Sequence, residues 1–259
     1  MIMKKLLGKR ALVTAGAQGI GLAISRHLLA AGCDVFVHYR SSAEGARSLE
    51  AEAADRARRY AHASADLTTA TGGEELVGAA VAFLGGLDIL VNNAGSLVAR
   101  KTLAEADDAF WQEVLELNVG SARRVTRAAL PHLAAAARTG GGASIVNLSS
   151  LAGRKGGHAG SLVYSTAKGA ILTFTRSLAS EVGPQGIRVN ALAPGLILGT
   201  SFHNTHTTKQ SADATIAGIP LGRGGSADDV ARAAVYLASE YDGFITGATL
   251  DINGGVYGC

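Results

Sequence analysis

The sequence predicts an α/β fold, in which a parallel β-sheet is covered by helices on both faces. Short apolar runs alternate with longer segments of helical periodicity along almost the whole chain. A glycine-rich segment at residues 14–21, called the glycine loop below, lies between the first apolar run and the first helical segment. The chain of 259 residues is long enough for one large α/β domain and short for two.

The elements follow from this alternation in order. The expected strands are residues 11–13, 34–38, 60–65, 87–91, 144–148, 187–192 and 248–252. The expected helices are residues 20–31, 43–59, 71–84, 107–137, 163–182 and 227–239. We expect Pro131 to interrupt or kink the helix at 107–137, and Ser226 to cap the last helix. The result is a doubly wound Rossmann fold with a mainly seven-stranded parallel sheet, whose ligand binds where the strand order reverses.

The composition excludes several classes of protein. Hydrophobic residues make up 47% and charged residues 17%, which excludes a disordered chain. The formal charge is only +3, and the closest candidate for a basic patch is Arg123, Arg124 and Arg127. We interpret these arginines as a solvated helix face, so no nucleic-acid partner is expected.

Residues 1–10 hold too short an apolar stretch for a signal peptide, and no apolar run approaches the roughly 20 residues that span a bilayer. Cys33 and Cys259 do not make a disulfide framework. We therefore expect a cytoplasmic protein without a membrane partner.

Two segments predict a dinucleotide site. Glycines in the glycine loop let the backbone approach a pyrophosphate, and the N-terminus of the following helix favours its charge. Folds that prefer NAD place a carboxylate at the end of the second strand, but this chain has His38-Tyr39-Arg40-Ser41 there. Arg40 can meet a 2′-phosphate and Ser41 can add a hydrogen bond, so we expect NADP, with NAD possible as the cofactor.

Tyr164 and Lys168 lie four residues apart in an expected helix, so the phenol and the ammonium share one face. The positive charge favours the phenolate and should lower the pKa of Tyr164 from about 10. Such a tyrosine can pass a proton to or from a carbonyl oxygen, which indicates hydride transfer to a ketone or from an alcohol.

Taken together, these motifs resemble the short-chain dehydrogenase/reductase family nearly end to end, and most closely its 3-oxoacyl-(acyl carrier protein) reductases. The glycine loop is similar to the family's Thr-Gly-x-x-x-Gly-x-Gly, with Ala15 between Thr14 and Gly16, and we take Gly16, Gly19 and Gly21 to keep the family's spacing. By resemblance, further residues contact the cofactor: Gln18, Ile20, Asp66, Leu67, Asn93, Ala94, Gly95, Pro194, Gly195 and Thr200.

The resemblance also implies catalytic roles. Tyr164 would be the acid or base, Lys168 would lower its pKa and bind the nicotinamide ribose, and Asn118 would hold a water in a proton relay. A serine would hold the substrate oxygen. Ser150 is preferred, with Ser149 and Ser161 as alternatives.

The substrate remains open at this point. The family's specificity segment corresponds to residues 196–222, which are unusually polar and include His203 and His206. A metal site there is not expected, because no third ligand has suitable spacing. The polarity favours a sugar or uronate-derived carbonyl compound, whereas a 3-oxoacyl thioester would need a basic docking patch such as Arg123, Arg124 and Arg127.

Two further expectations concern activity and assembly. A non-catalytic NADP-binding subunit is the alternative from another functional class. The resemblance also implies a homotetramer or homodimer, built on the helices near residues 107–137 and 163–182 and on the C-terminal strand.

Overall fold

The structure is a computed structural model, and it describes residues 6–200, 208–239 and 243–258. The seven strands within these ranges form one sheet in the order β3-β2-β1-β4-β5-β6-β7, and all neighbouring strands are parallel. The strands are β1 (Arg10–Val13), β2 (Asp34–Tyr39), β3 (Tyr60–Ser64), β4 (Ile89–Asn92), β5 (Ala143–Leu148), β6 (Ile187–Pro194) and β7 (Thr249–Ile252). The expected doubly wound α/β fold is confirmed, and its strand order reverses between β1 and β4.

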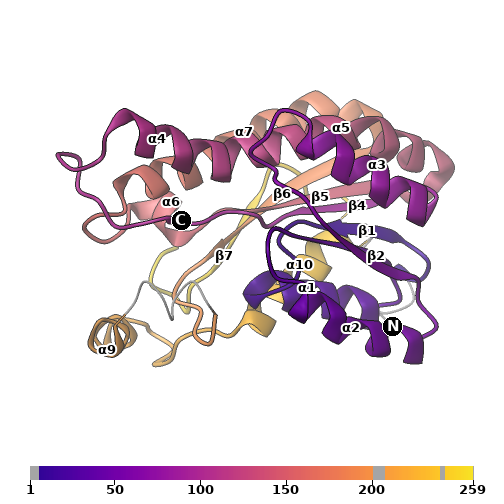
Figure 1. The fold of residues 1–259 in the computed structure, drawn as a ribbon. Coiled ribbons are helices and arrows are strands. Elements are labelled where there is room, and N and C mark those ends of the chain that lie inside the picture. The colour runs from indigo at the N-terminus through magenta and orange to yellow at the C-terminus, as the bar shows by residue number, and fades with distance from the viewer. Residues whose placement is uncertain (1–5, 201–207, 240–242, 259) are drawn as a thin grey trace.

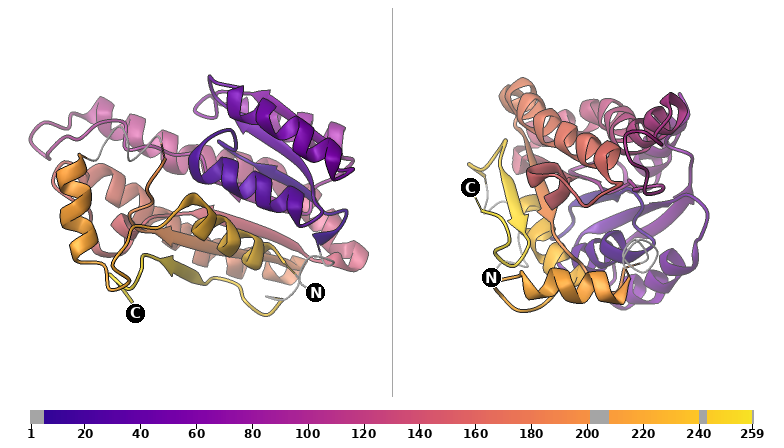
Figure 2. Two further views of the ribbon diagram at one scale, coloured as in Figure 1. Left: turned by 90° about the horizontal axis from the view of Figure 1, so that it is seen from below. Right: turned by 90° about the vertical axis from the view of Figure 1, so that its left-hand side faces the viewer.

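Helices cover both faces of this sheet (Figure 1). The α-helices are α1 (Gly19–Ala30), α2 (Glu44–Asp55), α3 (Gly72–Leu84), α4 (Asp108–Leu115), α5 (Ser121–Ala136), α6 (Leu151–Lys155), α7 (Leu162–Val182), α9 (Lys209–Ala217) and α10 (Ala227–Ala238). One face carries α1, α2 and α10, and the other carries α3, α5 and α7 with α4 beyond them. Figure 2 shows that α9 stands apart from both layers, at one end of the molecule.

The side chains of the strands alternate between two hydrophobic clusters. In β1, Ala11 and Val13 pack in the cluster under α1 and α10, while Leu12 packs in the cluster under α3 and α5. Each of these three side chains is fully buried. A strand buried on both faces reads as a continuous apolar run, which is why the strands were recognisable in the sequence.

The helical stretch after β4 is broken in a different place from the one expected. Pro131 lies inside α5 without ending it. The interruption is a π-helical segment, η2 (Glu116–Gly120), between α4 and α5. The Asn118 amide nitrogen donates to the Val114 carbonyl oxygen at 2.9 Å, so a side chain competes for an oxygen that regular helical bonding would use. The predicted interruption at Pro131 was therefore wrong, and the interruption includes a candidate site residue, Asn118.

Two short helices were not expected from the sequence. The first, α6, directly follows β5, and the second, α9, lies in the segment after β6. Both lie at the left end of the molecule in Figure 1, where several strands end. Ser226 caps α10 as predicted and forms a capping box with Asp229. No helix within the described ranges combines the length and hydropathy needed to cross a membrane.

Candidate active site

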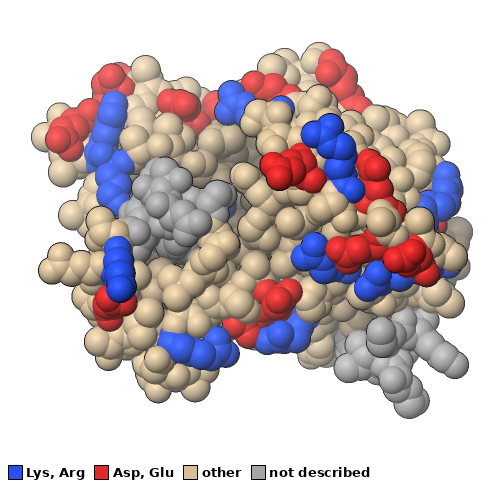
Figure 3. Space-filling view, turned by 60° about the horizontal axis from the view of Figure 1, so that its bottom comes forward, with Lys and Arg blue, Asp and Glu red and all other residues tan. Residues whose placement is uncertain are grey.

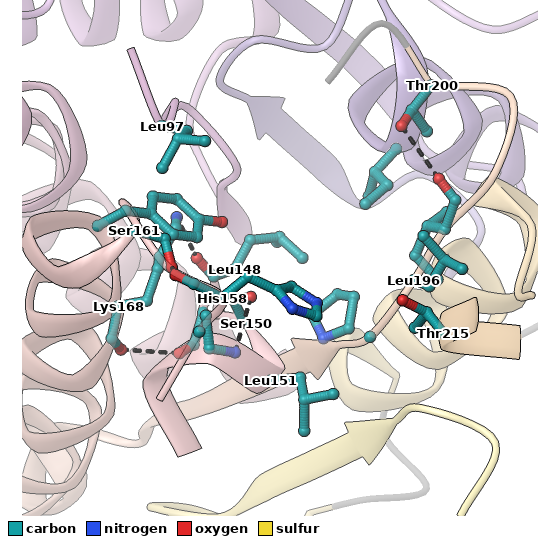
Figure 4. A pocket seen from close by; sticks show the side chains of 18 of the residues that line it. Leu97, Leu148, Ser150, Leu151, His158, Ser161, Lys168, Leu196, Thr200 and Thr215 are labelled. Carbon is teal, nitrogen blue, oxygen red and sulfur yellow. Dashed lines mark hydrogen bonds between the residues drawn. The ribbon is translucent and has the colours of Figure 1, made fainter. Parts of the chain in front are cut away.

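A cavity of about 890 Å³ opens at the carboxyl ends of the central strands. Its lining includes the start of α1, the segment after β4, the end of β5, α6, the first turns of α7, the segment after β6, and α9. Figure 4 shows side chains from these elements pointing toward one another across the cavity. This is the edge at which a doubly wound sheet binds its ligand.

Tyr164 and Lys168 both line this cavity from one face of α7, as their spacing predicts. The ammonium of Lys168 lies 5.7 Å from the centroid of the Tyr164 ring and donates to the Leu148 carbonyl oxygen at 2.9 Å. The Tyr164 hydroxyl shares a hydrogen bond with the side chain of Ser150. A phenol, a hydroxyl and an ammonium thus meet at the wall of the cavity, where Figure 4 labels Ser150 and Lys168.

The two neighbouring serines point to different partners. Ser149 donates through its hydroxyl to the Lys168 carbonyl oxygen at 2.8 Å, so it ties β5 to α7. Ser150 caps α6 by accepting from the Ala152 backbone nitrogen, and it also contacts Tyr164. The third alternative, Ser161, donates to the His158 carbonyl oxygen. The structure therefore brings Ser150, the preferred serine, to the phenol.

Burial governs the pKa values of this pair. Loss of solvation raises the pKa of Tyr164 to about 12, and the Ser150 hydrogen bond opposes this rise. Loss of solvation also lowers the pKa of Lys168 to about 8. The expectation that Lys168 brings the pKa of Tyr164 below its usual value was wrong for the site without cofactor. Desolvation of the phenol raises the pKa by more than the Ser150 hydrogen bond lowers it. At neutral pH the phenol carries its proton.

Asn118 lies behind the cavity rather than on its surface. Its amide nitrogen donates to the Ser96 and Val114 carbonyl oxygens, at 2.8 and 2.9 Å. Its amide oxygen is buried and has no hydrogen-bond partner. A Cβ added to Gly95 would lie 2.5 Å from that oxygen and 2.9 Å from the Lys168 ammonium. The unpaired oxygen is thus next to Lys168, where it can accept a hydrogen bond from water.

The glycine loop fits a bound pyrophosphate. A Cβ on Gly21 would lie 2.1 Å from the Ala15 carbonyl oxygen, so only glycine fits at this position. The following helix, α1, begins at Gly19 with no side-chain cap and no acidic residue in its first turn. Its free N–H groups can therefore meet an anion. Gln18, Gly19 and Ile20 line the cavity as expected.

The expected alignment of the first glycine was wrong. The residue in the left-handed conformation at the start of the loop is Ala15, with φ of 48°, and not Gly16. Ala15 therefore occupies the place where the family's first glycine relieves backbone strain. Gly16 is needed for another reason, because a Cβ there would lie 2.9 Å from the Ser25 hydroxyl and 3.0 Å from a Val37 methyl group.

The motif after β4 holds the glycine loop in place. The Thr14 hydroxyl accepts from the backbone nitrogens of Asn93 and Ala94, at 2.9 and 3.0 Å. The Asn93 amide nitrogen donates to the carbonyl oxygens of Thr14 and Ala15, at 3.2 and 3.0 Å. These two segments are neighbours because β1 and β4 pair at the reversal of strand order. Asn93 and Gly95 also line the cavity, while Ala94 does not.

The end of β2 carries Arg40 and Ser41 on the surface, outside the cavity lining. The Arg40 guanidinium lies 3.7 Å from the Asp66 carboxylate, and its side chain is 67% exposed. Hydrogen bonds from Thr68, with Arg40 as a smaller cause, lower the pKa of Asp66. The Leu67 side chain is buried in the core, so only its backbone is available to a ligand.

Sequence reasoning missed the role of His38. This buried residue accepts the Ala15 backbone N–H at Nδ1, and its Nε2 bonds the Ala65 carbonyl oxygen, each at 3.0 Å. Its backbone carbonyl oxygen also accepts from the Gly16 nitrogen at 2.8 Å. A histidine that ends a strand beside the glycine loop was the available signal in the sequence.

The far wall of the cavity follows β6. Pro194, Gly195 and Thr200 all line it. A Cβ on Gly195 would lie 2.9 Å from the Asn253 Cβ, so glycine lets this segment pack against the chain after β7. His203 and His206 lie outside the described residues. No cluster of metal-binding side chains occurs in the part of the chain that the structure describes.

The interpretation of the three arginines as a solvated face was wrong for Arg124. Its side chain is buried, donates to the Leu67 carbonyl oxygen and pairs with Glu116 at 2.5 Å. Arg127 pairs with Glu74 at 3.1 Å on the surface. Across the face drawn in Figure 3, basic and acidic side chains lie next to one another. The basic docking patch considered for a carrier protein thus loses Arg124.

Comparison with known proteins agrees with this geometry. A family model described as enoyl-(acyl carrier protein) reductase matches residues 14–257. The 3-oxoacyl-[acyl-carrier-protein] reductase FabG of Haemophilus influenzae is 35% identical over 250 residues, with 96% of this chain and 98% of that protein covered.

Two solved structures are similar throughout. The NADH-dependent reductase A1-R′ responsible for alginate metabolism is 33% identical with a TM-score of 0.89, and 98% of this chain and 99% of that chain are covered. A short chain dehydrogenase from Burkholderia cenocepacia in complex with NADP is 33% identical with a TM-score of 0.88, and 97% and 99% are covered. Since the family model and these relatives span nearly the whole chain, the protein belongs to the short-chain dehydrogenase/reductase family of NAD(P)-dependent oxidoreductases.

Proposed function

We propose that the protein is an NADPH-dependent carbonyl reductase, in which Tyr164, Ser150, Lys168 and Asn118 form the catalytic set. The observation that supports this most directly is the hydrogen bond between the Ser150 and Tyr164 side chains at the floor of the cavity. Two hydroxyl groups that meet in this way can both donate to one carbonyl oxygen.

In the proposed reaction, Ser150 and Tyr164 hold the carbonyl oxygen, and the Tyr164 hydroxyl gives it a proton. The reduced nicotinamide supplies the hydride when it is bound. A phenol with a pKa of about 12 keeps its proton at neutral pH, which is the form that reduction needs. The Lys168 ammonium, beside the ring, favours the negative charge that develops as the proton leaves.

Asn118 completes a route for the replacement proton. Its unpaired amide oxygen lies beside the Lys168 ammonium, as the space around Gly95 indicates. A water held between the two can return a proton from solvent to Lys168 and then to Tyr164. An asparagine fixed by two backbone carbonyl oxygens is rigid enough to hold that water.

The preference for NADPH is supported by the end of β2. Arg40 is exposed there, and neither Tyr39, Arg40 nor Ser41 offers a carboxylate for a ribose 2′-hydroxyl. Asp66 faces Arg40 at 3.7 Å and would share it with a 2′-phosphate. Replacing Arg40 by Ala should lower kcat/KM for NADPH by about tenfold and leave that for NADH within twofold. An unchanged NADPH-to-NADH ratio would refute this role.

The substrate class is best tested directly. Named relatives include a 3-oxoacyl carrier-protein reductase and a reductase of alginate metabolism, which favour 3-oxoacyl thioesters and uronate-derived carbonyl compounds respectively. A panel of both classes, with simple diketones and an enoyl thioester, would be followed by NADPH absorbance and repeated with NADH. We expect reduction of a carbonyl compound. If no compound of the panel is reduced although NADPH binds tightly, the result would favour the non-catalytic NADP-binding subunit.

The same proposal includes a cytoplasmic homotetramer or homodimer. Cys33 is a buried free thiol, which suits a reducing compartment. Leu250 on the C-terminal strand, Tyr236 on α10 and Phe244 before that strand are 40%, 45% and 103% exposed. Exposed apolar side chains, one of them on an edge strand, favour contact with a second copy. Light scattering after size exclusion tests this, and a monomer at micromolar concentration would refute it.

A further inference from the structure

Two basic side chains outside the catalytic set, Arg100 and Lys155, line the active-site cavity. None of the described lining residues is Asp or Glu. His158 lies close by in the chain, and its ring points into the middle of the cavity (Figure 4). A concave surface lined by one sign of charge concentrates ligands of the opposite sign.

The loop after α6 joins the parts of the chain that carry these two residues. Lys155 ends α6, and the chain then turns at Gly156, which has φ of 82°. The loop continues to Gly160, whose carbonyl oxygen accepts from the Lys101 backbone nitrogen at 3.0 Å. Arg100 donates to the Ala159 carbonyl oxygen at 3.3 Å. The segment after β4 and the loop after α6 are thus bonded side by side.

The two basic side chains next to these in the sequence, Arg154 and Lys101, contact other partners outside the cavity. Arg154 pairs with Asp251 at 2.6 Å, and the Lys101 ammonium lies 4.6 Å from the centroid of the Phe110 ring. Neither lines the cavity. Lys155 is exposed at the cavity wall and, among the described residues, has no ion pair within 4 Å.

The position of Lys155 relative to the carbonyl site limits where an anion can lie. Ser150 caps α6, and Lys155 is its last residue. At about 1.5 Å per residue, the five-residue helix separates them by about 8 Å. The flexible stem of lysine lets its ammonium reach part of the way back toward the carbonyl. A carboxylate bound by Lys155 would therefore be a few bonds from a carbonyl carbon held at Ser150.

The cofactor phosphates have their own place. The glycine loop and the uncapped start of α1 supply it, and α1 is well separated from α6 in Figure 1. Arg100 and Lys155 therefore remain for the substrate. The phosphate of a pantetheine thioester lies at the far end of a long arm from its carbonyl, which does not suit this spacing.

We infer that the substrate carries a carboxylate a few bonds from its reacting carbonyl group, and that Lys155 and Arg100 bind this carboxylate. This inference rests on the proposed reductase function and names its substrate class as acidic ketones or aldehydes. Arg100 and Lys155 are then specificity-determining residues, and Tyr164 and Ser150 act on the other end of the same molecule.

The test compares two ketones that differ in the charge of one group, 5-oxohexanoate and its methyl ester. Acetoacetyl-CoA is included as a third substrate, because its carbonyl group is carried on a pantetheine thioester. Replacing Lys155 or Arg100 by Gln should raise KM for 5-oxohexanoate by about three- to tenfold, with unchanged KM for the ester and the thioester. Lys101→Gln is the matched control, since it removes a neighbouring charge that does not face the cavity. Equal effects on acid and ester, or an effect on the thioester alone, would overturn the inference.

A binding measurement separates this inference from the proposed function. Calorimetry of 5-oxohexanoate with the NADP-loaded Tyr164→Phe variant needs no turnover. Binding that Lys155→Gln abolishes would support the carboxylate site even if no ketone were reduced, and the reductase proposal alone would then fail. Binding that survives Lys155→Gln and Arg100→Gln, or no binding at all, would overturn the carboxylate site whatever the activity.

Discussion

Lowering the pH should weaken the glycine loop through one buried histidine, His38. Its Nδ1 accepts the Ala15 N–H at 3.0 Å, and its Nε2 bonds the Ala65 carbonyl oxygen at 3.0 Å. Only the neutral imidazole can make both contacts, because a protonated ring has no acceptor. Burial lowers the pKa of His38 from its ordinary value, against the smaller opposing effects of the Ala65 hydrogen bond and the Asp66 charge.

The sign follows from proton binding in the two states. Since the pKa of His38 is lower in the folded protein, the unfolded chain binds more protons just below pH 6.5. The contribution of His38 to stability is therefore complete above pH 6.5 and is lost as pH falls toward the folded pKa. The loss is limited to about 1 to 3 kcal/mol, the cost of breaking one buried hydrogen bond and leaving a donor unpaired.

The assay compares unfolding and NADPH binding of the wild type and His38→Gln between pH 5 and 8. An amide can accept from Ala15 and donate to Ala65 but does not titrate in this range. We expect the wild type to lose stability and NADPH affinity relative to His38→Gln as the pH falls, whereas His132→Gln on α5 should track the wild type. Parallel pH profiles for wild type and His38→Gln would refute the reasoning.

Three substitutions of small residues test the local geometry. Ala15→Gly should stabilise the protein by about 1 kcal/mol, because Ala15 has φ of 48°, and an unchanged or lower Tm would contradict this. Gly21→Ala places a Cβ 2.1 Å from the Ala15 carbonyl oxygen, so NADPH affinity should fall by at least about tenfold in titrations, and wild-type affinity would disprove the close approach. Gly95→Ala pushes on Asn118 and Lys168, so kcat should fall by about a hundredfold while the protein stays folded, and a normal kcat would exclude that displacement.

The central strands were predictable because they are buried on both faces and therefore form continuous apolar runs, whereas β3 and β7 at the two edges of the sheet are only partly buried. The positions of Tyr164 and Lys168 on one face of α7 also followed from spacing alone. The break at η2 could not be predicted, because the Asn118 side chain that competes for the Val114 carbonyl oxygen is also held by Ser96 in a distant segment. Proline at position 131 was the stronger local signal, yet α5 tolerates it.

Charge patterns were the least predictable part of the site. Arg124 belongs to a run of arginines, but it is buried where it pairs with Glu116 two turns earlier and donates to the Leu67 carbonyl oxygen of a distant segment. Arg100 and Lys155 lie 55 residues apart in the chain, and only the folded structure shows that both line one cavity. The pKa of Tyr164 was misjudged for a similar reason, since helical spacing shows the ammonium nearby but not the desolvation of the phenol.

The central claim is that Tyr164 donates the proton to a bound carbonyl group. The most direct measurement compares Tyr164→Phe with the wild type for both NADPH affinity and turnover of whichever carbonyl compound the panel identifies. The phenyl ring keeps the packing of α7 and removes only the hydroxyl. We predict NADPH affinity within about twofold of the wild type and a loss of kcat of about 10² to 10⁴. Turnover that survives the substitution would contradict the account.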